Sequence, residues 1–214
     1  MDDDQVKELL QEVYFHPTCY MTDSGHGWNT GGKCSLDGTL KENQYNSIVE
    51  GKIAMLCHLL KDKGLPLEYY QISPEYDDTP LEVRVQREKE IFRRYKSTHL
   101  VLGHSIHADA FPDDITANGT GTFYYMGSRS VIFGEVMQKN LIERTHLADR
   151  GVRPKNLKMC RDTAAPWILT EAAFMTNPRE KELLKSDGFR NINAIAHVDG
   201  LLETVVLHYQ KLLS

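Results

Sequence analysis

The sequence lacks the features that would place it among disulfide-rich secreted proteins, membrane proteins or nucleic-acid-binding proteins. It has only four cysteines and no Cys-x-x-Cys pair, which argues against a cysteine-ligated zinc site and against a disulfide-stapled scaffold. No apolar run approaches the ~18 residues that a membrane-spanning helix needs. The formal net charge of -5 gives no basic excess for binding phosphates. We therefore expect reduced thiols, and neither a nucleic acid nor a membrane as partner.

The N-terminal segment also lacks a targeting signal. MDDDQVKELLQEVYF is acidic where a signal peptide is basic, and it has neither an apolar centre nor a small-residue cleavage site. This predicts a chain that is cytoplasmic as synthesised. Val6, Leu9, Leu10 and Val13 recur at helical spacing behind a run of aspartates, so a short amphipathic helix is expected over residues 3–14.

Strand-like and helix-like segments alternate along the chain, with no internal repeat, low-complexity tract or interdomain linker. Strands are expected at 18–22, 65–72, 98–108, 120–126 and 165–174. Helices are expected at 42–63, 81–95 and 128–146, with a long C-terminal helix around 192–209. Strands that alternate with helices of this length favour an α/β fold with a largely parallel sheet. We predict a single-domain, three-layer α/β/α fold with a mostly parallel mixed sheet flanked by helices.

Four polar residues stand where the predicted strands end or the next helix begins. They are His26, Glu42, His107 and Glu171. In an open α/β sheet, ligands bind beyond the C-terminal ends of the strands. Two imidazoles and a carboxylate are a recurrent donor set of catalytic zinc sites, and a second carboxylate can serve as the general base. Each residue alone is weak evidence, because a histidine in a Gly-rich turn is usually an exposed loop residue and a glutamate at a helix start usually complements the helix dipole.

Glu171 is harder to explain as a structural residue. It lies inside the apolar run PWILTEAAF, and burying a carboxylate without a partner is costly. His26 stands between two glycines, which we interpret as letting the backbone turn sharply after the strand and keeping side chains away from a bound ligand.

Four sequence blocks carry a resemblance to a known family. They are TDSGHGWNTGGK, DGTLKENQYN, HSIHADA and ILTEAAFMTNPRE. In order and spacing they resemble the zinc-dependent N-acetylmuramoyl-L-alanine amidases of the type 3 family, from residue 20 to the last helix. The resemblance implies that His26, Glu42 and His107 bind one Zn²⁺, that Glu171 is the catalytic carboxylate, and that residues 1–214 form a single amidase catalytic domain.

The sequence departs from the family pattern in three mild ways. Ala173-Phe174 replaces Gly-Phe, Thr176-Asn177 replaces Ser-Asn, and Asp109 stands where the family usually has Asn. None of these changes removes a residue to which the resemblance assigns a role.

Several neighbouring residues have two readings. Glu50 lies eight residues beyond Glu42 on the same predicted helix, and we interpret it as a solvated face residue rather than a ligand. His104 precedes His107 by three residues, so it points to the other face of the strand and is expected to pack. Asp23 either orients a ligand imidazole or stabilises its loop. Segment 109–120 either forms a wall of the substrate site or is a plain surface loop.

The resemblance implies hydrolysis of the amide bond between N-acetylmuramic acid and L-alanine, with peptidoglycan or a muropeptide as substrate. A peptidoglycan-directed zinc peptidase would use the same residues. A non-catalytic muropeptide-binding module would not require Glu171. Because the sequence contains no recognisable wall-binding module, it resembles a phage or prophage endolysin released by a holin-like route, or else a cytoplasmic enzyme acting on muropeptide fragments. No oligomeric state is indicated.

Overall fold

A six-stranded mixed sheet forms the centre of the computed structural model, which describes residues 16–213. The strands lie in the order β2-β1-β3-β6-β4-β5. Their bounds are β1 Thr18–Ser24, β2 Leu67–Gln71, β3 Leu100–Asp109, β4 Thr120–Tyr124, β5 Asp149–Pro154 and β6 Trp167–Phe174. The first four strands of this order are parallel, whereas β4 runs antiparallel to β6 and parallel to β5. The predicted mixed, mostly parallel sheet is confirmed, while the helix predicted over residues 3–14 lies outside the described residues.

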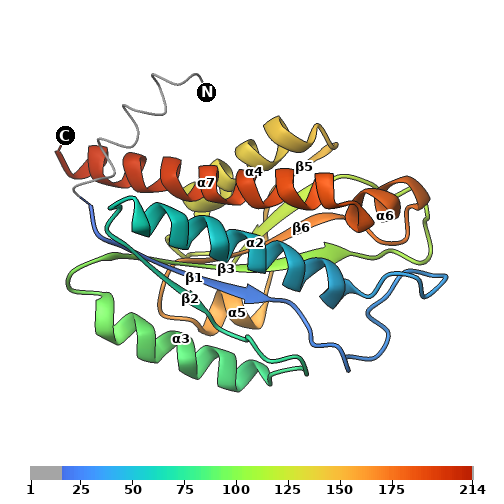
Figure 1. The fold of residues 1–214 in the computed structure, drawn as a ribbon, viewed down its shortest axis with the longest axis horizontal. Helices are drawn as coiled ribbons and strands as arrows, with labels where there is room; N and C mark the ends of the chain where they lie inside the picture. The colour runs from blue at the N-terminus through green and yellow to red at the C-terminus, as the bar shows by residue number, and fades with distance from the viewer. Residues whose placement is uncertain (1–15, 214) are drawn as a thin grey trace.

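Helices cover both faces of the sheet, which gives the predicted three layers (Figure 1). On one face lie α2 (Glu42–Asp62), α4 (Val131–Thr145) and α7 (Asp187–Leu213), and on the other lie α3 (Leu81–Tyr95) and α5 (Lys158–Asp162). The short α6 (Pro178–Lys185) connects β6 to α7. Within residues 16–213, no helix combines the length and apolar character that crossing a membrane requires.

Each face of the sheet has its own apolar core. The larger core joins α2, α4 and α7 to the sheet through residues such as Ile53, Met137 and Leu201. The smaller core lies beneath α3 and α5 around the fully buried Trp167. Gly103 on β3 faces this indole so closely that a Cβ there would lie 1.9 Å from the ring, so no other residue fits. Covering both faces explains why β3 and β6 read as nearly continuous apolar runs.

Three elements were not predicted from the sequence. They are β5, α5 and α6. The strand β5 lies at the edge of the sheet and is mostly exposed, so its sequence, DRGVRP, carries no apolar run or alternation. The two helices have five and eight residues, too few for a 3.6-residue periodicity to be recognised.

A buried ion pair fixes the C-terminal end of β1. The carboxylate of Asp23, which is 1% exposed, accepts hydrogen bonds from Arg84 Nη1 (2.7 Å), Ser73 Oγ (2.8 Å) and Ser105 Oγ (2.9 Å). Arg84 comes from α3, Ser105 from β3, and Ser73 from the segment after β2. No ligand imidazole is among these partners. Of the two readings of Asp23, the structure therefore favours stabilisation of the framework.

We expect Arg84→Ala to lower the free energy of unfolding by about 3–5 kcal/mol, because it leaves the buried carboxylate of Asp23 unpaired. Urea denaturation followed by circular dichroism measures this. Arg93→Ala, an exposed site on the same helix, is the matched control and should change stability by less than about 0.5 kcal/mol. Equal losses in the two variants would contradict this role for the ion pair.

Candidate metal centre

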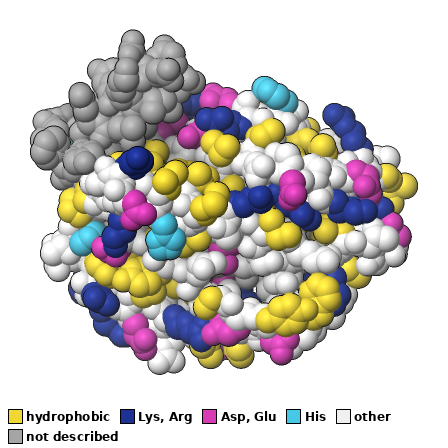
Figure 2. All heavy atoms as spheres, in the orientation of Figure 1, with side chains coloured by type: hydrophobic (Ala, Val, Ile, Leu, Met, Phe, Trp, Pro, Cys, Tyr) yellow, Lys and Arg dark blue, Asp and Glu magenta, His cyan; other side chains and the backbone are white. Residues whose placement is uncertain are grey.

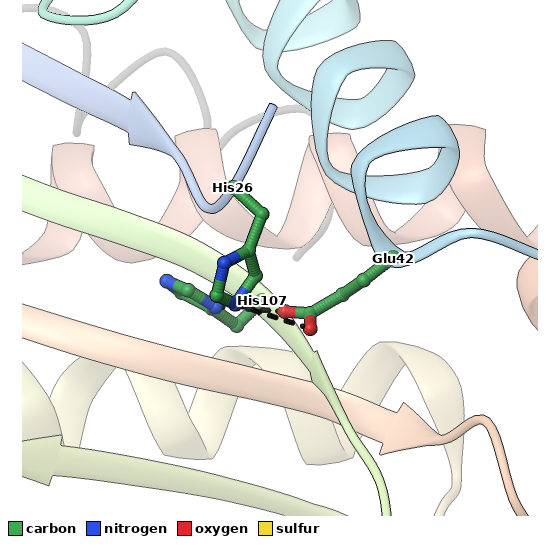
Figure 3. A group of neighbouring side chains, drawn as sticks. All are labelled: His26, Glu42 and His107. Carbon is green, nitrogen blue, oxygen red and sulfur yellow. Dashed lines mark hydrogen bonds and ion pairs between the residues drawn. The ribbon is translucent and has the colours of Figure 1, made fainter. Parts of the chain in front are cut away.

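Three side chains from separate elements converge beyond the C-terminal ends of β1 and β3 (Figure 3). His26 follows β1, Glu42 is the first residue of α2, and His107 lies near the end of β3. Glu42 Oε1 lies 2.7 Å from His107 Nδ1, and Glu42 Oε2 lies 3.3 Å from His26 Nε2. The two imidazole planes are nearly perpendicular, at 89°. One ligand atom from each residue lies within 4.8 Å of the others, which suits a single divalent ion.

The loop around His26 is tightly packed, and this corrects our reading of its glycines. His26 itself adopts the left-handed conformation, with φ 62°, whereas neither flanking glycine has a positive φ. A Cβ at Gly25 would lie 2.1 Å from the His107 ring, and one at Gly27 would lie 2.0 Å from the backbone of Asp78. The glycines are therefore required by close approach rather than by the turn.

The first turns of α2 hold this loop in place. Asn43 Nδ2 donates to the carbonyl oxygen of His26 (3.0 Å), and Asn46 Nδ2 donates to that of Gly25 (2.8 Å). Asn46 also donates to Glu42 Oε1 (3.3 Å). Sequence reasoning missed both asparagines, although their spacing of three residues places them on the same side of the helix start. They link the position of the carboxylate to that of the His26 loop.

Burial and mutual contact set the charges of the three residues. Burial lowers the pKa of His26 to about 4, so its imidazole is neutral at pH 7, the form that binds a metal. Burial is the largest single influence on both His107 and Glu42 and opposes their charge, but their hydrogen bond and the neighbouring charges together outweigh it, so the pKa of His107 is raised and that of Glu42 is lowered. The centre therefore supplies a carboxylate that its contact with His107 keeps ionised. This donor chemistry fits zinc.

Glu171 on β6 is the register partner of His107 on the neighbouring strand β3, so the two residues lie side by side. Its Oε2 is buried and has no hydrogen-bond partner among the described residues. Burial, followed by the nearby charge of Glu42, raises the pKa of Glu171 to about 8, although His107 opposes the shift. A carboxyl group with a pKa near neutrality and a free oxygen can both accept and donate a proton. The structure thus brings together all four residues singled out from the sequence.

The interpretation of Glu50 as a solvated residue was wrong. Its side chain is buried against β1 and β2, where it accepts hydrogen bonds from Thr22 Oγ1 (2.7 Å) and Gln71 Nε2 (3.1 Å). Asn46, Glu50, Ile53 and Cys57 form a buried row at helical spacing, so the buried face of α2 is wider than the apolar residues alone indicated. Glu50 is absent from the group that could hold a metal.

The prediction that His104 packs inside the protein is confirmed. Its ring is fully buried, with Nδ1 3.0 Å from Tyr20 Oη and Nε2 2.8 Å from Thr170 Oγ1. It stacks on His197 in the core beneath α7, on the face of the sheet opposite the smaller core. The segment 109–120, in turn, is exposed from residue 110 to 116, and its role as a wall of the substrate site stays a prediction.

Comparisons with known proteins show which family this chain is similar to. A family model described as Amidase_3, N-acetylmuramoyl-L-alanine amidase, matches residues 21–203. An endolysin of Bacillus phage SPP1 is 26% identical over 200 residues, which cover 86% of this chain. An uncharacterized cell wall amidase of Bacillus anthracis is 36% identical over 108 residues, or 46% of this chain. The chain spans only 65% and 20% of these two relatives, respectively.

A solved structure shares the fold almost throughout. It is the catalytic domain of CwlV, an N-acetylmuramoyl-L-alanine amidase from Bacillus (Paenibacillus) polymyxa var. colistinus. The match has a TM-score of 0.76 and 26% sequence identity, and it covers 88% of this chain and 98% of that one. Because the match covers nearly all of that catalytic domain, the two chains share the same overall fold.

We predict that the protein binds one Zn²⁺ and that Glu42→Gln or His107→Ala abolishes this binding. At a free zinc concentration of about 100 times Kd, binding should stabilise the wild type by about 2.7 kcal/mol. Elemental analysis after gel filtration and thermal melts with and without zinc measure both effects. Glu50→Gln, on the same helix as Glu42, is the control and should retain the metal. Loss of zinc from Glu50→Gln but not from Glu42→Gln would reverse the assignment.

A pH effect on stability should originate at Glu50. Burial raises its pKa from the ordinary 4.5 to about 7, so the folded state favours the protonated form. This contribution to stability is complete below pH 4.5 and is lost as the pH rises through 7, a decrease of about 3 kcal/mol. In Glu50→Gln this decrease should be absent. Urea denaturation between pH 4.5 and 7.5 should therefore show that the free energy of unfolding of the variant rises relative to that of the wild type as the pH increases. The exposed Glu90→Gln should instead parallel the wild type throughout.

Proposed function

The chain belongs to the N-acetylmuramoyl-L-alanine amidase family, whose members are hydrolases, and we propose that it is a zinc-dependent enzyme that cleaves the amide bond between N-acetylmuramic acid and L-alanine in peptidoglycan. The observation that carries the proposal is the position of the unpartnered Glu171 carboxyl beside a His26, Glu42 and His107 cluster. The family match over residues 21–203 supports the substrate class.

In this mechanism His26, Glu42 and His107 hold the metal. When bound, a divalent ion such as zinc acts as a Lewis acid that polarises the scissile carbonyl and makes water a better nucleophile at neutral pH. Asn43 and Asn46 fix the position of the His26 loop relative to the Glu42 carboxylate through their hydrogen bonds. Glu171 is the register partner of His107, so its carboxyl adjoins the residues that would hold the metal.

Glu171 performs the proton transfers. Its carboxylate accepts a proton from the attacking water while the water oxygen bonds to the lactyl carbonyl carbon. The protonated Glu171 then donates to the alanine nitrogen as the C–N bond breaks. The products are the free lactyl carboxylic acid and a new N-terminal amine on L-alanine. A pKa near 8 suits a group that must first accept this proton and then return it.

The same geometry is compatible with cleavage within the stem peptide, and only the products distinguish a peptidase from an amidase. A non-catalytic binding module is disfavoured, because such a module has no need for a buried, unpartnered carboxyl beside the three ligands.

We further propose that residues 1–214 act as the catalytic domain of a lysin that reaches the wall by a holin-like route. The similarity to the endolysin of Bacillus phage SPP1 supports this role. A purified protein that leaves suspensions of intact cell walls turbid but cuts soluble muropeptides would instead favour an enzyme of fragment recycling.

Glu171→Gln should slow cleavage by at least ~10²- to 10⁴-fold while the zinc content stays unchanged, because only the proton-transfer group is lost. Digestion of purified peptidoglycan, followed by mass spectrometry of the fragments, measures this. The wild type should release new N-terminal L-alanine and leave the glycan chains intact. Fragments cut within the stem peptide would reassign the enzyme as a peptidase. A Glu171→Gln variant as active as the wild type would exclude the proposed role of Glu171.

A further inference from the structure

Three cations project from the edge strand β5 and the residue after it. They are Arg150, Arg153 and Lys155, and all three are exposed. No carboxylate of the described residues lies within ion-pairing distance of any of them; Arg150 instead donates to the carbonyl oxygen of Asn118 (3.1 Å). On the face drawn in Figure 2, by contrast, side chains of both charge signs are interspersed. In a chain of net charge -5, three neighbouring cations without ion pairs need an explanation.

Each of these cations lies over an aromatic ring. The guanidinium of Arg153 and the ammonium of Lys155 lie 5.1 Å and 4.7 Å from the centre of the Phe123 ring. The guanidinium of Arg150 lies 4.8 Å from the centre of the Phe174 ring. Both phenylalanines are buried, so exposed charges lie over buried rings. Contact with a ring face orients a cation but leaves its N–H groups free to bind an anion.

This basic strip, formed by Arg150, Arg153 and Lys155, lies next to the catalytic carboxyl. Gly121 on β4 is the direct antiparallel partner of Glu171, and such partners project on the same face with Cβ positions about 5 Å apart. A Cβ at Gly121 would lie 3.2 Å from Arg153 Nη2. The guanidinium of Arg153 therefore lies over Gly121, on the same face of the sheet as Glu171. Because residue 121 has no side chain, nothing there separates the two groups.

We infer that the basic strip binds the carboxylates of the stem peptide and so places the peptide, rather than the glycan, over β4 and β5. This inference rests on the proposed amidase function. The lactyl carboxyl group of the sugar forms the amide bond that is to be cleaved. The N-acetylated sugar therefore carries no charge at its lactyl group. The negative charges of the substrate are on the peptide, which has at least its terminal carboxylate. Arginine side chains match carboxylates with two parallel hydrogen bonds.

Cations and Pro154 on an edge strand also prevent that edge from pairing with another chain. That role requires charge anywhere along the edge. It does not account for cations seated on buried rings, nor for the position of Arg153 over the partner of Glu171. The two explanations differ in whether the substrate's charge matters.

The test uses two substrates that differ only in charge: N-acetylmuramoyl-L-alanyl-D-glutamate, with two carboxylates, and its diamide. Arg153→Gln should reduce kcat/KM for the dicarboxylate by roughly ten- to a hundredfold, mostly through KM, since a charged hydrogen bond is lost away from the reacting atoms. The diamide should change by less than about twofold. Arg153→Lys should restore part of the loss, and Arg93→Gln on α3 should change neither substrate.

Equal losses on both substrates, or no loss on either, would overturn the inference. Calorimetric titration with the peptide L-alanyl-D-glutamate and with its diamide keeps the test independent of turnover. If the wild-type protein binds the dicarboxylate more tightly than the diamide and Arg153→Gln loses this preference, the result supports the basic strip. This holds even if no amide is cut, in which case only the proposed function fails. Cleavage of both substrates with no preference for charge in either assay retains the amidase and excludes the strip as a carboxylate site.

Discussion

The ion pair between Asp23 and Arg84 is the constraint on which the catalytic edge depends. Burying a carboxylate is tolerable only when a cation and further donors surround it. Arg84 meets this condition from α3 and extends the network to Asp78, to which Nη2 donates (2.6 Å). One guanidinium therefore fixes the end of β1 relative to the segment after β2. The His26 loop starts two residues beyond Asp23 and packs against the backbone of Asp78, so its geometry follows from this pair.

Asp23, Glu42, Glu50 and Glu171 are buried or nearly so around this edge, and their partners determine what each can do. Asp23 is paired with a guanidinium, Glu42 with two imidazoles, and Glu50 with neutral donors. Only Glu171 has an oxygen left without a partner among the described residues. The first three are therefore occupied by their partners, whereas the fourth keeps an oxygen free to accept a proton, as the proposed mechanism requires. Chemical roles therefore follow from differences in surroundings among otherwise similar side chains.

Sequence patterns predicted the sheet and the location of the site because both depend on regularities along the chain. Buried parallel strands read as apolar runs, and the resemblance to a family connected His26, Glu42, His107 and Glu171 across the fold. The pairing of Asp23 with Arg84 was not predictable, because 61 residues separate them and no local pattern links them. Glu50 was misjudged for a related reason.

A charged residue on a helix is usually solvated, and only the neighbouring strands reveal the donors that allow Glu50 to be buried. The edge strand β5 escaped recognition because edge strands carry charges where central strands carry apolar residues. Both errors concern polar side chains whose environment is decided by tertiary contacts rather than by their own segment.

The left-handed backbone at His26 restricts how the donor set can evolve or be redesigned. Among non-glycine residues, that conformation is readily adopted by Asn, Asp and His, and strongly disfavoured by β-branched side chains. Of the tolerated residues, only His and Asp are common metal ligands. Exchange at this position can therefore replace nitrogen with oxygen, a shift in preference toward harder ions such as Mn²⁺. If the site holds a metal as proposed, the backbone of one loop residue thus limits the range of ions that it can be selected to bind.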